Sequence, residues 1–173
     1  MTKKEFLRSV SNGHEDVIQI FLDALNAARV AYCVIGGLAV NAYVEPVVSL
    51  DLDIVIATDD VAGACKAVGK YFKIEQFPHS VNLKSSRSDL RIQIQTDPRY
   101  QSFILSSETR SVLGYEMKVA AIQDVLKGKV WAYSGETHRK SKRQKDLADI
   151  IRLTEEYPEL TVQLPASMQA LTS

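Results

Sequence analysis

The spacing of apolar residues predicts helices towards both ends of the chain and strands between them. Residues 15–29, 122–133 and 145–156 repeat apolar side chains at the three- and four-residue spacing of a helix face. Short apolar or alternating runs predict strands, over residues 31–35, 50–57, 73–77, 81–84, 89–96 and 114–119. Strands first and helices at the end are typical of an α+β domain, here with a mixed sheet flanked by helices.

Turn residues and helix caps divide these elements. Gly36-Gly37 ends the first strand, and a short helix over residues 38–43 follows it. Asp59-Asp60 make a good N-cap for a helix over residues 61–72. A basic loop over residues 136–143 separates the last two helices.

The chain of 173 residues suits one domain that can bury an ordinary core. We expect the core over about residues 30–120 and a C-terminal helical part over about residues 121–157. Because Pro158 and Pro165 interrupt the C-terminal segment, residues 158–173 are expected to form an irregular tail.

Composition and charge indicate a soluble globular protein without an evident macromolecular partner. Hydrophobic residues make up 46% of the chain, and 21 basic residues balance 21 acidic ones, which gives no sign of nucleic-acid or membrane binding. The start of the chain lacks the apolar core of a signal peptide, so we expect a cytoplasmic protein. Cys33 and Cys65 lie in apolar patterns and are expected to be buried free thiols.

Asp51 and Asp53 are the strongest candidates for chemistry. They lie two residues apart on a predicted strand, so both carboxylates project from one face, roughly 7 Å apart at Cα. Two such carboxylates repel each other unless a cation lies between them, and their oxygens suit Mg²⁺ or Mn²⁺ bridging to nucleotide phosphates. The alternative is the polar face of a solvated edge strand. The low β propensity of Asp favours function.

Gly36-Gly37 strengthens this interpretation because it precedes the strand that carries the two aspartates. A Gly-Gly turn between strand and helix lets the backbone approach a ligand and leaves helix amides free to bind an anion. A tight turn without a ligand is the alternative. Together, the turn and the aspartates suggest a phosphate cradle that faces a divalent-metal site.

These motifs resemble those of a known superfamily. Residues 34–39 (VIGGLA) and 49–54 (SLDLDI) resemble the strand–GG–helix–(S/T)xDxD core of the DNA polymerase β-like nucleotidyltransferases. Residues 124–132 and 142–150 (KRQKDLADI) resemble the DLxxxKxxA and R(x)KDLxDI pattern of one branch. That branch is named after the abortive-infection toxins of bacterial toxin–antitoxin systems. The resemblance covers roughly residues 32–153.

The resemblance implies a nucleotidyltransferase that moves NMP from an NTP to a hydroxyl acceptor, with Mg²⁺ or Mn²⁺ as cofactor. It implies as partners a nucleoside triphosphate, an acceptor that is a small molecule, RNA or protein, and a cognate antitoxin protein. By the same resemblance, Asp51 and Asp53 would bind the metal and take part in catalysis. Gly36-Gly37 would hold the nucleotide phosphates, and Ser49 would add a hydroxyl contact.

The C-terminal part would complete the implied site. Lys129 would reach the triphosphate as a cationic clamp, and Lys145-Asp146 would join it from the last helix, with Lys129 and Asp146 among the catalytic residues. The alternatives are that Lys129 flanks a buried apolar stripe and that the last helix is a solvated charged helix with local ion pairs.

The sequence departs from the superfamily pattern at two positions. Many members carry an Arg where this chain has Val47. A third acidic residue normally lies on a later strand, and the matching position here is Gln93, or Arg91 if the register slips. The amide of Gln93 cannot act as a general base. Asp97 could replace the missing acid only if its strand ended earlier than expected.

Two other functions compete with an active transferase. A catalytically impaired member of the fold would bind nucleotide or protein only, which the amide of Gln93 favours. A haloacid-dehalogenase-type phosphatase also uses a DxD signature, but its nucleophile lies at the carboxyl end of a buried strand. Here the apolar run of residues 54–57 follows the acids, which argues against that class.

Overall fold

A mixed sheet of seven strands forms the centre of the protein. The computed structural model describes residues 1–136 and 138–173. The strands follow the order β3-β4-β5-β2-β1-β7-β6, in which β1–β7 and β2–β5 are parallel and the other pairs antiparallel. Their bounds are β1 (Tyr32–Ile35), β2 (Asp51–Ile56), β3 (Lys73–Phe77), β4 (Ser80–Lys84), β5 (Arg91–Gln95), β6 (Glu108–Val112) and β7 (Tyr115–Val119). The predicted α+β class with a mixed sheet is confirmed.

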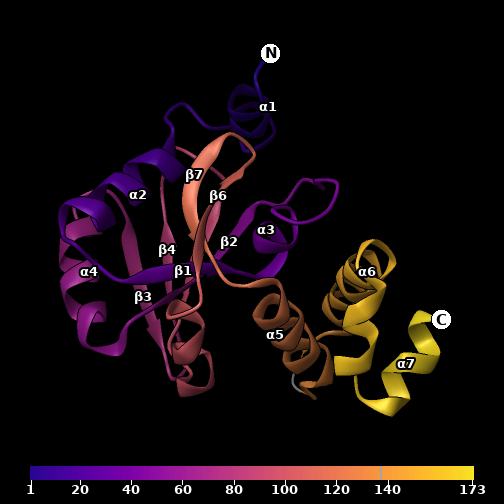
Figure 1. Ribbon diagram of the computed structural model, residues 1–173. Helices are drawn as coiled ribbons and strands as arrows, with labels where there is room; N and C mark the ends of the chain where they lie inside the picture. The colour runs from indigo at the N-terminus through magenta and orange to yellow at the C-terminus, as the bar shows by residue number, and fades with distance from the viewer. Residues whose placement is uncertain (137) are drawn as a thin grey trace.

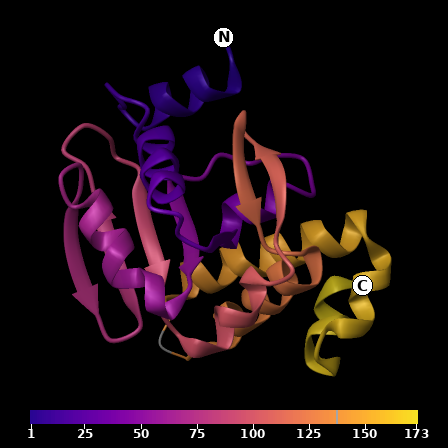
Figure 2. The same ribbon diagram turned by 60° about the vertical axis from the view of Figure 1, so that its left-hand side comes forward.

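Helices cover both faces of the sheet (Figures 1 and 2). Helices α2 and α4 lie on one face, and α3, α5 and α6 gather on the other. The α-helices are α1 (Lys3–Val10), α2 (Val17–Ala27), α3 (Gly36–Val40), α4 (Val61–Val68), α5 (Ile122–Ser134), α6 (Lys140–Glu156) and α7 (Ala166–Thr172). Within the described residues the chain also forms 3₁₀ helices, namely η1 (Thr58–Asp60), η2 (Pro98–Ile104) and η3 (Pro158–Gln163). Among the described residues, every helix is too short or too polar to span a bilayer.

The central strands carry the core. All four residues of β1 are buried, and in β2 Leu52, Ile54 and Val55 have no exposed surface. Strands covered by helices on both faces bury nearly all their side chains, so β1 and β2 have fixed positions in the sheet. Asp51 and Asp53 are the two less buried residues of β2.

The predicted strands are all present, with ends that shift by at most two residues. The prediction did not include α1 and β6. Strand β6 lies at the sheet edge with mostly exposed residues, and α1 buries only Leu7, so neither has a clear apolar period. Helix α6 begins at Lys140, so residues 140–143, half of the predicted basic loop, are helical. Lys, Arg and Gln are good helix formers, which explains this. Residue 137 of that loop lies outside the described residues.

The C-terminal tail is helical, so the prediction of an irregular tail was wrong. Helix η3 buries Leu160, α7 buries Met168, and the extended residue Leu164 between the two helices is also buried. Pro158 begins η3 and Pro165 directly precedes α7. At a helix start the missing N–H of proline loses no hydrogen bond, so these prolines begin helices instead of breaking them.

Candidate active site

Gly36 and Asp53 meet at the end of β1. Ile35 pairs with Asp53 across the antiparallel β1–β2 ladder, so the Asp53 side chain stands beside the turn into α3. Gly36 has a φ of +70°, and a Cβ at this position would lie 2.5 Å from Asp53 Oδ2. The Asp53 carboxylate occupies the volume that a side chain at position 36 would fill. Any residue with a Cβ would clash with it and would also be strained at this φ, so the position requires glycine.

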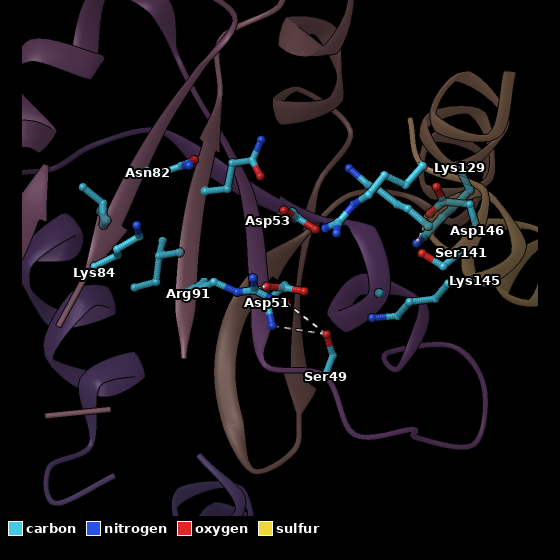
Figure 3. A pocket seen from close by; sticks show the side chains of 16 residues that line it. Ser49, Asp51, Asp53, Asn82, Lys84, Arg91, Lys129, Ser141, Lys145 and Asp146 are labelled. Atoms are coloured by element: carbon cyan, nitrogen blue, oxygen red, sulfur yellow. Dashed lines mark hydrogen bonds and ion pairs between the residues drawn. The ribbon is translucent and has the colours of Figure 1, made fainter. Parts of the chain in front are cut away.

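Asp51 and Asp53 lie at the centre of a pocket of about 510 Å³ between the sheet and α6 (Figure 3). One wall comes from β4 and β5, and the other from Gly37, Ser49 and the first turns of α6. Three acidic side chains line the pocket: Asp51, Asp53 and Asp146. Six basic side chains line it: Lys84, Arg91, Lys129, Arg139, Lys142 and Lys145. The pocket therefore has an excess of positive charge in a chain whose formal net charge is zero.

The two aspartates have different surroundings. The Asp51 carboxylate pairs with Arg91, with 2.8 Å between Oδ1 and the guanidinium Nε. Burial raises the pKa of the Asp53 carboxyl above its ordinary value of 3.8, although Lys129 acts in the opposite direction. The Ser49 hydroxyl lies within 3.3 Å of the backbone N and O of Asp51, and so supports the start of β2.

Lys129 is buried between α5 and α6. Only 7% of its surface is exposed, and its ammonium lies 2.9 Å from Asp146 Oδ1 and 2.7 Å from Asp149 Oδ2. Burial by itself would lower the pKa of Lys129, but Asp149 and Asp146 outweigh it and raise this pKa. The ammonium expected to clamp the triphosphate therefore already holds two carboxylates, although it lines the pocket.

A chain of polar contacts runs from Asp149 to the loop before β2. Arg152 donates from Nη1 to Asp149 Oδ1 at 2.8 Å and from Nη2 to the backbone oxygen of Glu45. The Asn41 amide donates to Val47 O at 2.7 Å and accepts from Val47 N at 3.0 Å. These contacts fasten the loop that leads to Ser49. The sequence analysis missed Arg152 and Asn41 because both bind backbone groups of the loop before β2, and no sequence motif indicates such contacts.

The strand register decides the position of the expected third acid. Gln93 is the direct neighbour of Asp53, and Arg91 is the neighbour of Asp51. Asp97 lies beyond the end of β5, where it pairs with Arg99 and caps η2. The residue beside Asp53 is therefore an amide, and Asp97 does not line the pocket.

Among residues 1–136 and 138–173, no group of three or more His, Cys, Asp and Glu side chains is arranged to hold a metal ion. Asp51 and Asp53 nevertheless fit a Mg²⁺ ion that arrives with a nucleotide, since Mg²⁺ commonly takes one or two carboxylates together with substrate phosphates.

Solved structures with the same arrangement of helices and strands exist, although their sequences differ strongly from this one. No family model and no curated protein matches the sequence. The lincomycin-bound lincosamide antibiotic adenylyltransferase LnuA superposes with a TM-score of 0.57 at 13% identity, over 82% of this chain and 99% of that one. ANT(2″)-Ia in complex with adenylyl-2″-tobramycin superposes with a TM-score of 0.62 at 12% identity, over 90% and 94%. The chain has the nucleotidyltransferase fold.

Two further structures with nucleotidyltransferase names share this fold. A nucleotidyltransferase-like protein from Paracoccidioides brasiliensis has a TM-score of 0.52 at 18% identity, over 95% of this chain and 92% of that one. A nucleotidyltransferase structure from Thermotoga maritima also has a TM-score of 0.52, at 14% identity, over 76% and 86%.

The nucleotidyltransferase fold brings together residues that are far apart in the sequence. Gly37, Ser49, Asp51, Asp53, Gln93, Lys129, Lys145 and Asp146 all line the pocket, and Gly36 adjoins Asp53. Polar pocket residues that the sequence analysis did not single out are Asn82, Lys84, Arg139 and Ser141. The alternating burial along β4 indicates that Asn82 and Lys84 share a face of the sheet. The sequence of β4 does not indicate which strand lies beside it.

Proposed function

We propose that the protein is a nucleotidyltransferase that moves NMP from an NTP to a hydroxyl acceptor. The observation that carries the proposal is the position of Asp51 and Asp53 at the centre of a basic pocket. Nucleotidyl transfer depends mainly on positioning and charge neutralisation, which carboxylate-bound metal and lysines can supply. LnuA, which shares this fold, is named an adenylyltransferase.

The first turns of α6 are the proposed triphosphate site. Ser141, Lys142 and Lys145 line the pocket there, and the first turn of this 17-residue helix contains no acidic residue. The helix dipole and the two lysines both favour an anion at this end. Helix α3 is only five residues long, so Gly36-Gly37 contributes mainly by permitting close approach of the phosphates.

The proposed reaction exchanges one phosphorus–oxygen bond for another. The acceptor oxygen forms a bond to the α-phosphorus. The bond between that phosphorus and the oxygen that bridges it to the β-phosphorus breaks, and its electron pair leaves with pyrophosphate. The hydroxyl proton leaves to solvent, because the Gln93 amide cannot accept it. Asp51 and Asp53 would hold a Mg²⁺ ion, which neutralises phosphate charge when bound. Lys142 and Lys145 would hold the leaving pyrophosphate.

The test uses α-labelled NTPs, Mg²⁺ and a panel of hydroxyl acceptors. Asp53→Asn should lower the rate of transfer at least a hundredfold and weaken Mg²⁺-dependent NTP binding in calorimetry. Asp59→Asn is the matched control, because Asp59 is an exposed carboxylate outside the pocket. Transfer and binding that are equal in wild type and Asp53→Asn would contradict the proposal.

A second candidate is a member of the fold that binds nucleotide without turnover. Gln93 beside Asp53 and the Arg91–Asp51 ion pair favour it, because both reduce the negative charge available to metal. NTP binding without transfer to any acceptor would support this candidate. Transfer that appears only in Gln93→Asp would identify the missing carboxylate as the cause.

A toxin–antitoxin role is proposed on the sequence resemblance alone, with the cytoplasm as its compartment. Expression of the chain should then arrest growth, and co-expression of a small regulator encoded by a neighbouring gene should relieve the arrest. If Asp53→Asn arrests growth as strongly as wild type, the arrest does not come from nucleotidyl transfer.

A further inference from the structure

Two rows of side chains cross β2, β5 and β4 on the face of the sheet that carries the pocket. One row consists of an acid and two amides: Asp53, Gln93 and Asn82. The other consists of an acid and two bases: Asp51, Arg91 and Lys84. Neighbouring strands are roughly 4.8 Å apart. Arg91 and Lys84 therefore extend the pocket from the aspartates in the direction opposite to α6 (Figure 3).

Both bases of the second row can bind a ligand. Arg91 pairs with Asp51 through Nε, which leaves the two terminal amino groups of its guanidinium for another partner, and its side chain is 66% exposed. Lys84 pairs with Glu75 at 3.1 Å, and its side chain is 52% exposed. Exposed ion pairs of this kind are weak and exchange readily for a stronger anion.

Each carboxylate that lines the described pocket already pairs with a base or would hold the proposed metal. Among the described residues that line it, Asp51 pairs with Arg91 and Asp146 pairs with Lys129. Asp53, the third acid, would hold the metal together with Asp51. A polyamine would therefore meet positive charge on both walls of the pocket.

Asn82 adds a hydrogen-bond acceptor to the same wall. Its Oδ1 is buried and has no hydrogen-bond partner among the described residues. A buried unpaired amide oxygen is unfavourable unless a ligand or water completes it. Asn82 lines the pocket next to Gln93, two strands from Asp53, so its amide lies beside an acceptor that extends from Asp53 along this row.

We propose that Arg91, Lys84 and Asn82 form an acceptor subsite for compounds that carry a phosphate group close to the reacting hydroxyl. This inference rests on the proposed function, since it concerns the acceptor of the same reaction. The triphosphate takes the α6 wall, the acceptor phosphate takes Arg91 and Lys84, and the acceptor hydroxyl lies between them near Asp53. The bonds formed and broken are those of the proposed transfer.

The test compares acceptors that differ only in charge. With α-labelled NTP and Mg²⁺, kcat/KM for ribose 5-phosphate should exceed that for ribose at least tenfold, and tobramycin should not be labelled. A short oligoribonucleotide in parallel distinguishes a phosphorylated small molecule from the end of a nucleic-acid strand. In the double variant Arg91→Gln/Lys84→Gln, the ratio of kcat/KM for ribose 5-phosphate to that for ribose should fall to near one. In the same double variant, kcat/KM for the oligoribonucleotide should fall, relative to wild type, at least tenfold more than kcat/KM for ribose.

These ratios cancel any effect of the variant on NTP binding. Lys66→Gln, an exposed lysine on α4 outside the pocket, is the matched control and should keep the wild-type ratio. The proposal is overturned if neither phosphate-bearing acceptor is preferred over ribose, if tobramycin is the best acceptor, or if the preference survives in the double variant.

A binding measurement separates failure of this inference from failure of the proposed function. Ribose 5-phosphate, ribose and the oligoribonucleotide are titrated calorimetrically into protein loaded with Mg²⁺ and a non-hydrolysable NTP. If the NTP does not bind, the proposed function fails. If the NTP binds but neither phosphate-bearing compound binds more tightly than ribose, only the acceptor subsite is wrong, whether or not turnover occurs.

Discussion

Gly36 and Asp53 constrain each other at the scale of single residues. The Asp53 carboxylate stands where a Gly36 side chain would be, and the turn needs a positive φ at that glycine. Any larger residue must move either the carboxylate or the turn. The position of the proposed metal ligand therefore depends on a residue that carries no functional group.

We predict that Gly36→Ala destabilises the protein by at least about 1–2 kcal/mol, the usual strain of a left-handed backbone for a residue with Cβ. It should also weaken Mg²⁺-dependent NTP binding about tenfold, because Asp53 is displaced. Urea denaturation and calorimetry measure the two effects. Gly63→Ala is the control, since nothing lies within 4 Å of a Cβ there. Because Gly63 lies in the first turn of α4, this variant should stabilise the protein by up to about 1 kcal/mol. Equal stability of the two variants would refute the steric argument.

Helices α5 and α6 are joined by one buried lysine. Lys129 on α5 holds Asp146 and Asp149 on α6, and Arg152 extends the contact to the loop before β2. Removing one partner from a buried ion pair leaves uncompensated charge in the interior. The position of the α6 wall relative to Asp51 and Asp53 is therefore tied to Lys129.

Lys129→Met should lower the free energy of unfolding by about 3–5 kcal/mol at pH 7. The control Lys127→Met removes an exposed lysine that lies 4.0 Å from Asp124, and should change stability by less than about 1 kcal/mol.

The effect of Lys129→Met has a defined pH dependence. The pKa of Lys129 in the folded state is raised above its ordinary value of 10.5. Its stabilising contribution is therefore complete below pH 10.5 and is lost as the pH rises through the folded-state pKa. The difference between wild type and variant, measured by denaturation, should stay constant from pH 7 to 9. A difference that already shrinks within that range would contradict the assignment.

Charge is unevenly distributed over the whole molecule. Basic and acidic residues balance at 21 each, yet six basic side chains and three acidic ones line one pocket. A basic pocket attracts a polyanion through the combined field of its side chains. Net charge alone therefore conceals the ligand preference that the folded chain has.

NTP affinity should fall with ionic strength. Between 0.1 M and 1 M NaCl the Debye length decreases from about 10 Å to about 3 Å, and we expect at least a tenfold rise in Kd. Calorimetry at several salt concentrations measures this. The double variant Lys142→Gln/Lys145→Gln should show a smaller salt dependence, whereas Lys66→Gln should match wild type. An affinity independent of salt would show that the basic side chains do not bind the nucleotide.

Much of the fold could be predicted from local pattern, and the failures have local causes. Strand β2 was predictable because Leu50, Leu52 and Ile54 alternate with Asp51 and Asp53. Helices η3 and α7 were missed because two prolines suggested a break, although Leu160 and Met168 are buried. Edge elements such as β6 bury too little surface to show a period.

The sequence alone determined that Asp51 and Asp53 share one face of a strand and that Gly36 lies at a turn. Side-chain direction along a strand and turn conformation depend on neighbouring residues in the chain. Only the tertiary structure decided what surrounds them. Strand register places Arg91 beside Asp51 and Lys84 beyond it, and helix packing turns Lys129 towards two carboxylates. Register and packing are set by long-range burial of apolar faces, which no local pattern specifies.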